Sequence, residues 1–389
     1  MNVRKLLTLL AALAVALILV VALISLLPAL LQAVQPAGVD RTGAVASVLA
    51  ITPITIPKRL AIYYGWPSSV NAANGNIAQA TAVFTQFDLI VFGHGLQHGP
   101  GDPYISLDPA LHIPHPDYTN TVAIIHNLLD AGKEVYGYID LGVSSTNHSL
   151  TTIADLVNEW AATGVTGIFY DLGGKDWGVS RARLISAVDL AHNHSPSLTV
   201  FANIWDPDDA FGPDPEGPPP LRDGDWYLAE SHPVSNDEHD SFDLWWVKSQ
   251  KIMAYRNQAN GVRMAAVGTG NAGPTSTITD STYWVDHPPF RQTLWATYLF
   301  GFDAFGFTDI IYSAHCSCLR PLPDIPTDIG EVFIGPPISP SAATGALTYT
   351  RFTDKGVIYV FGDAGDPAVC DGAFLNLPFR AFVPLVHTP

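Results

Sequence analysis

The chain has 389 residues, of which 36 are acidic and 19 basic, so its formal net charge at pH 7 is −17. No basic cluster follows Arg4 and Lys5 near the N-terminus. Because nucleic acids are bound through clustered lysine and arginine, this balance argues against a nucleic-acid partner. We expect a monomer that does not bind nucleic acid.

The first 32 residues predict membrane targeting. From Leu6 to Leu31 the chain is almost wholly apolar. A bilayer span needs about 20 such residues and a cleaved signal about 7 to 15, so the length favours an uncleaved anchor over cleavage near Ala33. With Arg4 and Lys5 on the cytoplasmic side, the rest of the chain is extracytoplasmic. We expect a single-pass cell-membrane protein, or a secreted one if the segment is cleaved.

Residues 33–57 are rich in Ala, Val, Thr and Pro, show no helical or strand period, and predict a linker. From residue 58 to about 315, short apolar runs alternate with longer stretches of helical spacing, which is typical of βα units. Eight runs predict strands: Arg59 to Tyr64, Phe87 to Gly93, Glu134 to Asp140, Val165 to Asp171, Leu198 to Asn203, Asp225 to Glu230, Val262 to Gly268 and Phe302 to Thr308.

The stretches between these runs predict helices, because their large apolar residues recur three or four positions apart. They are Thr119 to Leu129, Leu150 to Ala162, Val179 to His192, Phe242 to Ala259 and Arg291 to Phe300, with Gly132, Gly164 and Gly261 placed to end three of them.

Eight units in about 250 residues, with continuous apolar strands, favour an α/β fold of the (β/α)₈ TIM-barrel type. The alternative is a doubly wound open sheet. That fold would need a glycine-rich phosphate turn after the first strand, and Gly65-Trp66-Pro67-Ser68 has no such fingerprint.

Residues 316–389 form a proline-rich segment with a β-hairpin expected around Asp354-Lys355-Gly356, and we interpret the segment as an accessory β appendage. Residues 379–386 could add a strand. In an oxidising compartment Cys370 could bridge to Cys316 or Cys318, which we favour over a zinc site because no Cys-x-x-Cys pair is present. We expect no metal and no other cofactor.

A barrel builds its active site at the C-terminal ends of its strands, so the residues that close each run are the informative ones. Here these positions are polar and aromatic: Tyr64, Trp66, His94, Tyr138, Asp140, Asp171, Asn203, Trp205, Asp206, Glu230, His232 and Asp309. Carboxylates among aromatic platforms are what sugar chemistry requires, because aromatic rings stack on pyranose faces and two carboxyl groups flank the glycosidic bond.

Asp171 and Glu230 are the best-placed pair, since they close the fourth and sixth runs and should face the same mouth. The alternative for Asp171 is an N-cap or turn residue before the next helix. Glu230 is a poor capping and strand residue, which favours a functional role. We assign Glu230 as general acid/base and Asp171 as nucleophile or water-activating base, with the reverse assignment open.

The other mouth residues have structural alternatives, and we interpret them as substrate-binding candidates. The aromatic residues Tyr64, Trp66 and Trp205 could close the core, and isolated histidines are often structural. Asp206 begins an Asp-Pro-Asp-Asp sequence that suits a turn or helix N-cap. The acidic, proline-rich loop 211–220 could wall one side of the cleft.

The run Gly167-Ile-Phe-Tyr-Asp171 resembles the strand-four motif of glycoside hydrolase family 114, the endo-α-1,4-polygalactosaminidase and spherulin-4-like barrels. The resemblance extends from about residue 58 to 313, through Trp177-Gly-Val-Ser-Arg-Ala-Arg183, Val200-Phe-Ala-Asn203 and Leu228-Ala-Glu-Ser231. It implies catalytic carboxylates at Asp171 and Glu230. The family motif usually continues Asp-Glu, whereas Leu172 follows here, so a helper carboxylate is absent.

These features predict an extracytoplasmic glycosidase that cuts a polysaccharide, and the resemblance implies a galactosamine-containing one. A second hypothesis is an inactive cell-surface carbohydrate-binding barrel, motivated by Leu172. The separation of the two carboxyl groups distinguishes them, because a working pair lies about 5 to 5.5 Å apart for retention or 6.5 to 9.5 Å for inversion. A third hypothesis is a different barrel hydrolase, such as a phosphodiesterase or a metal-dependent deacetylase, using His94, His232 and Asp140.

Overall fold

The computed structural model describes residues 51–100, 114–241, 243–258, 261–270, 282–314, 316–339, 348–362 and 371–376. The predicted anchor at residues 1–32 lies outside these ranges and stays a prediction. Within the described ranges, no helix is both long and apolar enough to cross a bilayer.

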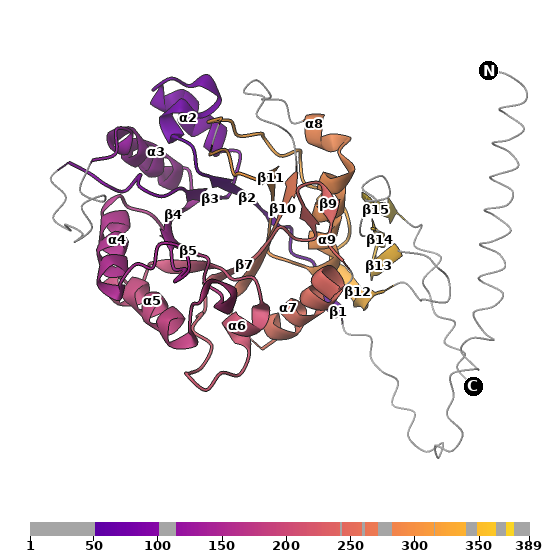
Figure 1. Cartoon of the computed structure of the whole chain (residues 1–389). Coiled ribbons are helices and arrows are strands. Elements are labelled where there is room, and N and C mark those ends of the chain that lie inside the picture. The colour runs from indigo at the N-terminus through magenta and orange to yellow at the C-terminus, as the bar shows by residue number, and fades with distance from the viewer. Residues whose placement is uncertain are drawn as a thin grey trace, which may run out of the picture. The chain divides into compact units, whose positions relative to one another are not determined.

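Eight parallel strands close into a barrel, so the predicted (β/α)₈ architecture is confirmed (Figure 1). Each predicted strand overlaps an observed one. Around the barrel the strands are β2 (Lys58–Tyr63), β3 (Leu89–Phe92), β4 (Glu134–Asp140), β5 (Gly167–Asp171), β6 (Thr199–Asn203), β7 (Trp226–Glu230), β10 (Arg263–Gly270) and β11 (Ala304–Asp309).

Helices surround the barrel, as Figure 1 shows. They are η1 (Pro67–Ala72), α2 (Ile77–Phe84), α3 (Tyr118–Asp130), α4 (Leu150–Ala162), η3 (Lys175–Trp177), α5 (Arg181–His194), α6 (Pro207–Phe211), the π-helical turn η4 (Asp243–Val247), α7 (Lys248–Arg256), α8 (Thr282–Val285) and α9 (Pro288–Phe300). Gly132 and Gly164 follow the C-caps of α3 and α4 in the left-handed conformation, as predicted. Gly261 is left-handed too, but it lies beyond the end of α7, close to Asp223.

The barrel interior is filled by alternate residues of its strands. Tyr136, Phe169, Phe201, Trp226 and Leu228 belong to one buried cluster inside the barrel. Their sequence neighbours on the same strands, such as Ile168 and Val200, belong to a separate cluster that packs against the helices. This period of two follows from strand geometry, because successive side chains point to opposite faces of the sheet.

A second sheet lies against α9. It contains β1 (Ile51–Pro53), β12 (Val332–Ile338), β13 (Thr348–Thr353), β14 (Gly356–Phe361) and β15 (Asp371–Asn376) in that order, all antiparallel. The hairpin predicted around residues 354–356 is confirmed as β13 and β14. Helix α9 is buried on nearly all sides, because it packs on the barrel strands and on β14 and β15. A separate two-stranded hairpin, β8 (Val234–Ser235) with β9 (Glu238–His239), follows β7.

Two sequence-based expectations for the termini are wrong. Residues 51–53 do not belong to a structureless linker, because as β1 they pair with β12. A disulfide joins Cys316 to Cys318, which leaves neither sulfur for the bridge to Cys370 that the sequence suggested. The spacing of the cysteines along the chain could not distinguish these pairings. Cys370 and residues 379–386 lie outside the described ranges.

Arg181, at the first turn of α5, holds the loop that follows β6. Its buried guanidinium donates hydrogen bonds to four backbone carbonyl oxygens, those of Asp208, Asp209, Gly212 and Gly217. A buried carbonyl that loses its donor costs about 1–3 kcal/mol. One side chain therefore fixes α6 and the chain after it against α5.

We predict that Arg181→Met lowers the free energy of unfolding by roughly 2–4 kcal/mol, because these carbonyls lose their donor. Urea denaturation measures the change. Arg222→Met is the control: Arg222 pairs with Asp189 on the surface, and exposed ion pairs contribute less than about 1 kcal/mol. Equal losses in the two variants would contradict a clamping role for Arg181.

Candidate functional site

The strand alternation that fills the barrel also places three polar side chains in its mouth. Asp171, Asn203 and Glu230 each follow an interior residue of the same strand by two positions, after Phe169, Phe201 and Leu228. They therefore point inward at the C-terminal ends of three adjacent strands, β5, β6 and β7.

The Asn203 side chain bridges the two predicted carboxylates. Its Nδ2 donates hydrogen bonds to Asp171 Oδ1 at 2.7 Å and to Glu230 Oε2 at 2.6 Å. An amide nitrogen carries two hydrogens, so each carboxylate receives one. Because both oxygens bond the same nitrogen, they cannot be farther apart than the two distances combined, 5.3 Å. This limit lies below the separation of about 6.5–9.5 Å that inverting glycosidases use.

Tyrosines complete the surroundings of the pair. Tyr312 donates its hydroxyl to Glu230 Oε1 at 2.7 Å, and Tyr138 hydrogen-bonds Asp171. Tyr64 lies between these two tyrosines, with ring centroids 5.4 Å from each. Burial and the nearby carboxylates raise the pKa of all three hydroxyls, so the tyrosines stay protonated and donate.

The environment of Asp171 strongly changes the pKa of its carboxyl group. It is 8% exposed, and burial, followed by the charge of Glu230, raises its pKa to about 7. Hydrogen bonds from Asn203, Tyr138 and the Leu172 backbone act in the opposite direction but do not cancel this effect. Asp171 can therefore carry a proton near neutral pH beside a partner that is held by two donors.

The backbone is strained immediately after both carboxylates. Leu172, Ser231 and Tyr312 adopt the left-handed conformation, with φ of 54°, 48° and 49°. Such a conformation costs a non-glycine residue about 1–3 kcal/mol and persists only where the surroundings impose it. Strain of this kind concentrates at functional sites. Here it occurs next to Asp171, next to Glu230 and at Tyr312, which donates a hydrogen bond to Glu230.

Three tryptophans that follow strand ends are exposed: Trp66 after β2, Trp177 after β5 and Trp205 after β6. The Lys248 Nζ lies 4.0 Å from the Trp205 ring centroid, so a cation–π contact supports this ring. Trp66 leans edge-on against His115. The sequence left open whether Trp66 and Trp205 close the core; in the structure their rings are partly accessible beside the mouth.

Three predicted carboxylates hold turns. Asp140 Oδ1 accepts from the Gly142 backbone and the Ser145 hydroxyl, at 2.7 and 2.8 Å. Asp206 caps α6 through the Asp208 backbone N–H, which was the structural alternative that its sequence context suggested.

The third turn places Tyr312. Asp309 accepts from the backbone N–H groups of Ile311 and Ser313 on either side of it. These interactions shape the mouth and leave Asp171 and Glu230 as the pair that faces it.

The two predicted histidines are in different places. His94 lies beside the rings of His98, Tyr138 and His148 near the mouth. His232 is 1% exposed and its Nε2 pairs with the Ser249 hydroxyl of α7 at 2.7 Å, so it cannot contact a substrate and is not part of the site we describe. Among the described residues, no three His, Cys, Asp or Glu side chains group as metal ligands.

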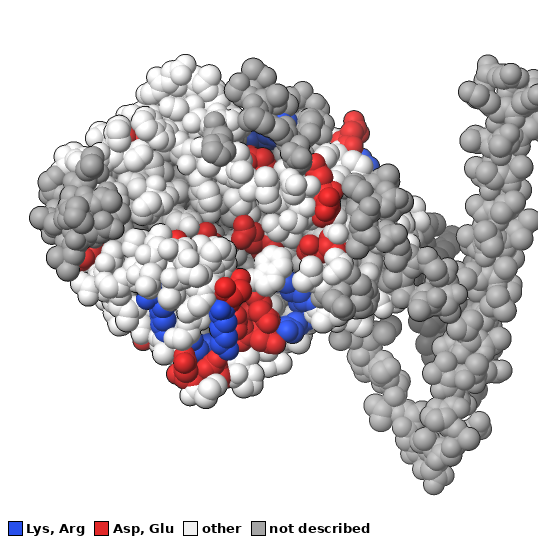
Figure 2. All heavy atoms as spheres, in the orientation of Figure 1, with Lys and Arg blue, Asp and Glu red and all other residues white. Residues whose placement is uncertain are grey.

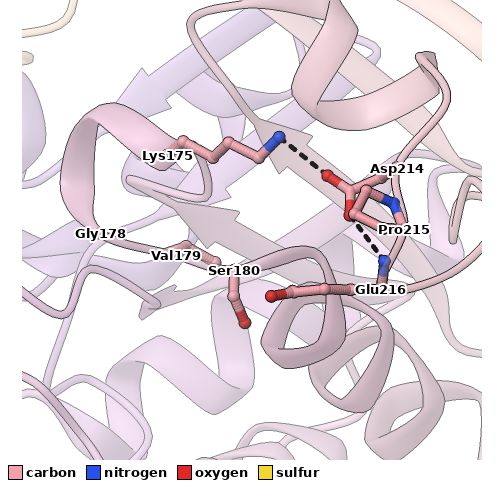
Figure 3. A pocket seen from close by; sticks show the side chains of 7 residues that line it. All are labelled: Lys175, Gly178, Val179, Ser180, Asp214, Pro215 and Glu216. Atoms are coloured by element: carbon pink, nitrogen blue, oxygen red, sulfur yellow. Dashed lines mark hydrogen bonds and ion pairs between the residues drawn. The ribbon is translucent and has the colours of Figure 1, made fainter.

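A cavity of about 380 Å³ lies between Asp214, Pro215 and Glu216 of the loop after α6 and residues 175–180 before α5. Neither Asp171 nor Glu230 lines it, so the expectation that loop 211–220 walls the catalytic cleft stays a prediction. Figure 3 shows Lys175 and Asp214 pointing toward each other across it; their ion pair is 2.8 Å long. Glu216, two residues after Asp214, accepts a hydrogen bond from the Ala182 backbone at the start of α5. Its polar side chains are thus engaged in holding the loop.

Sequence reasoning missed Tyr312 and Lys248 among the residues at the site. Tyr312 lies three residues beyond Asp309, which closes the last strand, so a search that continued into each following loop would have included it. Lys248 carries no such signal, because it begins α7 and approaches Trp205 only through the fold.

Comparison with known proteins gives structural likenesses only. No family model and no curated protein matches the chain. The glycoside hydrolase domain of PelA from Pseudomonas aeruginosa is 17% identical, with a TM-score of 0.41 over 68% of this chain and 100% of that one. A glucosidase from Croceicoccus marinus is 11% identical, with a TM-score of 0.41 over 80% and 77%.

A third structure, an endocellulase from Pyrococcus horikoshii, is 12% identical, with a TM-score of 0.39 over 66% of this chain and 85% of that one. Values this low do not indicate a shared activity. The chemistry of this chain therefore has to be argued from its own site.

The raised pKa of Asp171 predicts a pH-dependent stability. This group ionises near 3.8 when unfolded and near 7 when folded, so the folded state holds the extra proton, and the contribution of Asp171 to the stability of the wild type falls between about pH 4 and 7. Asp171→Asn removes this loss. We expect its unfolding free energy, relative to wild type, to rise over that range by up to roughly 4 kcal/mol.

Urea denaturation at pH 4 to 8 measures this difference, with the exposed Asp189→Asn as the matched control. A difference between Asp171→Asn and wild type that stays flat over this pH range would contradict the raised pKa.

Proposed function

We propose that the chain is a retaining glycoside hydrolase that cuts a polysaccharide with Asp171 and Glu230. The observation that carries this proposal is the shared Asn203 bridge, which limits the nearest carboxylate oxygens to 5.3 Å. Inverting enzymes need about 6.5–9.5 Å between the two groups to admit a water, so the close pair favours a covalent glycosyl–enzyme intermediate.

The environments of the two carboxyl groups favour the assignment of roles that the sequence left as the alternative. Asp171, with its pKa near 7, can protonate the leaving oxygen and then activate water. Glu230, held by Tyr312 and Asn203, is placed to attack the anomeric carbon as a carboxylate. Separating an acid from a nucleophile by environment is how two carboxylates divide this chemistry.

The carbohydrate-binding alternative rested on Leu172 in place of a helper carboxylate. In the described site, the two carboxyl groups are positioned by other side chains instead. Asn203, Tyr138 and Tyr312 hydrogen-bond them directly. A protein that only binds sugar has no need to hold two carboxylates at a catalytic separation. We therefore favour hydrolysis.

We further propose that the substrate is a partly deacetylated amino-sugar polymer, as the resemblance to the polygalactosaminidase barrels implies. Carboxylates outnumber amines in the loops after the strand ends, and Figure 2 shows acidic side chains grouped near the centre of the face toward the viewer. The acidic side chains include Asp140, Asp176, Asp206, Asp208, Asp209, Asp214, Glu216, Asp237, Asp240 and Asp309, and the basic ones there and at the start of α7 include Lys175, Arg222, Lys248 and Lys251. Such a mouth attracts ammonium groups electrostatically.

We propose that the protein is a monomer that acts on its polymer outside the cytoplasm. It is tethered to the cell membrane by residues 1–32, or secreted if that segment is cleaved. The apolar run and the two basic residues before it support the tether. A soluble fragment of the protein must retain residues 51–53, because they form β1 and pair with β12.

We expect the full-length chain to release reducing ends from partly deacetylated galactosaminogalactan, and both Asp171→Asn and Glu230→Gln to lose at least about 1000-fold of kcat/KM. NMR of the first product should show retained anomeric configuration. Asp189→Asn, on the surface, should cleave like wild type. Unchanged cleavage by either carboxylate variant, or an inverted product, would contradict the proposed pair or its geometry.

The acidic mouth predicts a salt effect that depends on the substrate. Raising salt from about 0.1 to 1 M shortens the Debye length from about 10 to 3 Å. The KM for partly deacetylated polymer should rise several-fold, whereas that for fully N-acetylated polymer should change less than about twofold. Initial rates at fixed pH measure both, and equal responses would argue against electrostatic recognition.

A further inference from the structure

A small cavity lies between Trp205, in the loop after β6, and the start of α7. It measures about 160 Å³ and is lined by Trp205, Asp206, Pro207, Leu244, Val247, Lys248 and Lys251. Trp205 lies two residues beyond Asn203, the residue that bridges Asp171 and Glu230. Sites for whole ligands enclose about 300–1000 Å³, so this cavity fits one substituent of a larger ligand.

Lys248 is the unusual member of the lining. The residue is only 8% exposed, and its buried Nζ has no hydrogen-bond partner within the described part of the chain. Its neighbour Lys251, by contrast, pairs with Asp208 at 2.8 Å and with Asp206 at 3.4 Å. Burying an ammonium without hydrogen bonds is costly, so an acceptor on a ligand would recover part of that cost.

The charges around Lys248 indicate what kind of acceptor fits. The carboxylates of Asp240, Glu230, Asp206 and Asp176 all act on its ammonium. Burial nevertheless lowers the pKa of Lys248 to about 8. Several nearby carboxylates would repel an anionic ligand, and the ammonium itself would repel a cationic one at short range. A neutral hydrogen-bond acceptor remains.

The rest of the lining is apolar. Leu244 and Val247 are exposed aliphatic residues from the π-helical turn η4, and the Trp205 ring is 41% exposed. Trp245 of the same turn is fully buried against Tyr349 of β13, with ring centroids 4.1 Å apart, and this contact holds the turn in place. Single π-helical turns are frequent at functional sites.

We propose that this cavity, which we call the Trp205 pocket, is a subsite for the acetamido group of an N-acetylated amino sugar. Lys248 Nζ donates to the acetamide oxygen, Leu244 and Val247 contact its methyl group, and the sugar ring lies against Trp205. A deacetylated unit is disfavoured here, because its ammonium would face that of Lys248. The subsite deepens the proposed glycosidase function and rests on it for its biological meaning.

The test measures binding, so that it does not depend on turnover. The full-length chain carrying Asp171→Asn is titrated calorimetrically with three tetrasaccharides: N-acetylated α-1,4-galactosamine, its deacetylated form, and galacturonate. Lys248→Met, added to this background, should weaken binding of the acetylated form about tenfold and strengthen that of the deacetylated form. Lys251→Met, the matched control in the same cavity, should change either by less than about twofold.

Leu244→Ala provides a second arm, because it removes the methyl contact and should weaken only the acetylated ligand, about threefold. Lys248→Met should not lower the melting temperature, since it replaces a buried ammonium that has no hydrogen-bond partner among the described residues by an apolar side chain of similar length. Equal weakening of the acetylated and deacetylated ligands by Lys248→Met, or no binding of any tetrasaccharide, would overturn the subsite. Lys248-dependent binding of galacturonate alone would overturn it in favour of an anion site.

These results separate the subsite from the enzyme activity. Polymer cleavage by wild type without any effect of Lys248→Met on acetylated binding would overturn the subsite and leave the glycosidase intact. Acetyl-specific binding that depends on Lys248, without polymer cleavage, would support the subsite and overturn the proposed activity.

Discussion

The inward and outward alternation of side chains in a closed barrel is the constraint on which the rest of this molecule depends. Phe169, Phe201 and Leu228 fill the interior, and two positions later the same three strands present Asp171, Asn203 and Glu230. The buried layer below makes the mouth rigid and poorly solvated. The same strands hold the polar layer above in place, so Asp171 and Glu230 both lie within hydrogen-bond distance of Asn203.

This placement has an electrostatic consequence. Asp171 and Glu230 are hydrogen-bonded to the same amide nitrogen, in a place with little water. Burial and the charge of Glu230 therefore raise the pKa of Asp171. The left-handed residues beside the pair add backbone strain. The barrel core, the clamp formed by Arg181 and the sheet packed on α9 supply the stability that lets such a site persist.

The strand ends and the loops contribute different kinds of side chain. The strand ends supply the carboxylates and the tyrosines that hold them, whereas the loops supply exposed tryptophans and most of the negative charge. The C-terminal sheet, which the sequence marked only as accessory, contributes indirectly. Its Tyr349 packs against Trp245 and thereby supports the turn that faces Trp205. An appendage far from the carboxylates in sequence thus helps to shape the cleft.

The sequence by itself determined the barrel and the pair at its mouth. Eight apolar runs predicted eight strands, and Asp171 and Glu230 stood out because each closes such a run; these are local patterns. It could not determine that Asn203 joins them, that Tyr312 holds Glu230, or that Lys248 lies over Trp205.

The sequence also could not determine that β1 pairs with β12 or that Cys316 is joined to Cys318. Most of these contacts join residues tens to hundreds of positions apart. The disulfide joins near neighbours, but it was a choice among partners that spacing does not rank. Only the folded chain brings such groups within reach, because hydrogen bonds and charge interactions act over a few ångströms and leave no period in the sequence.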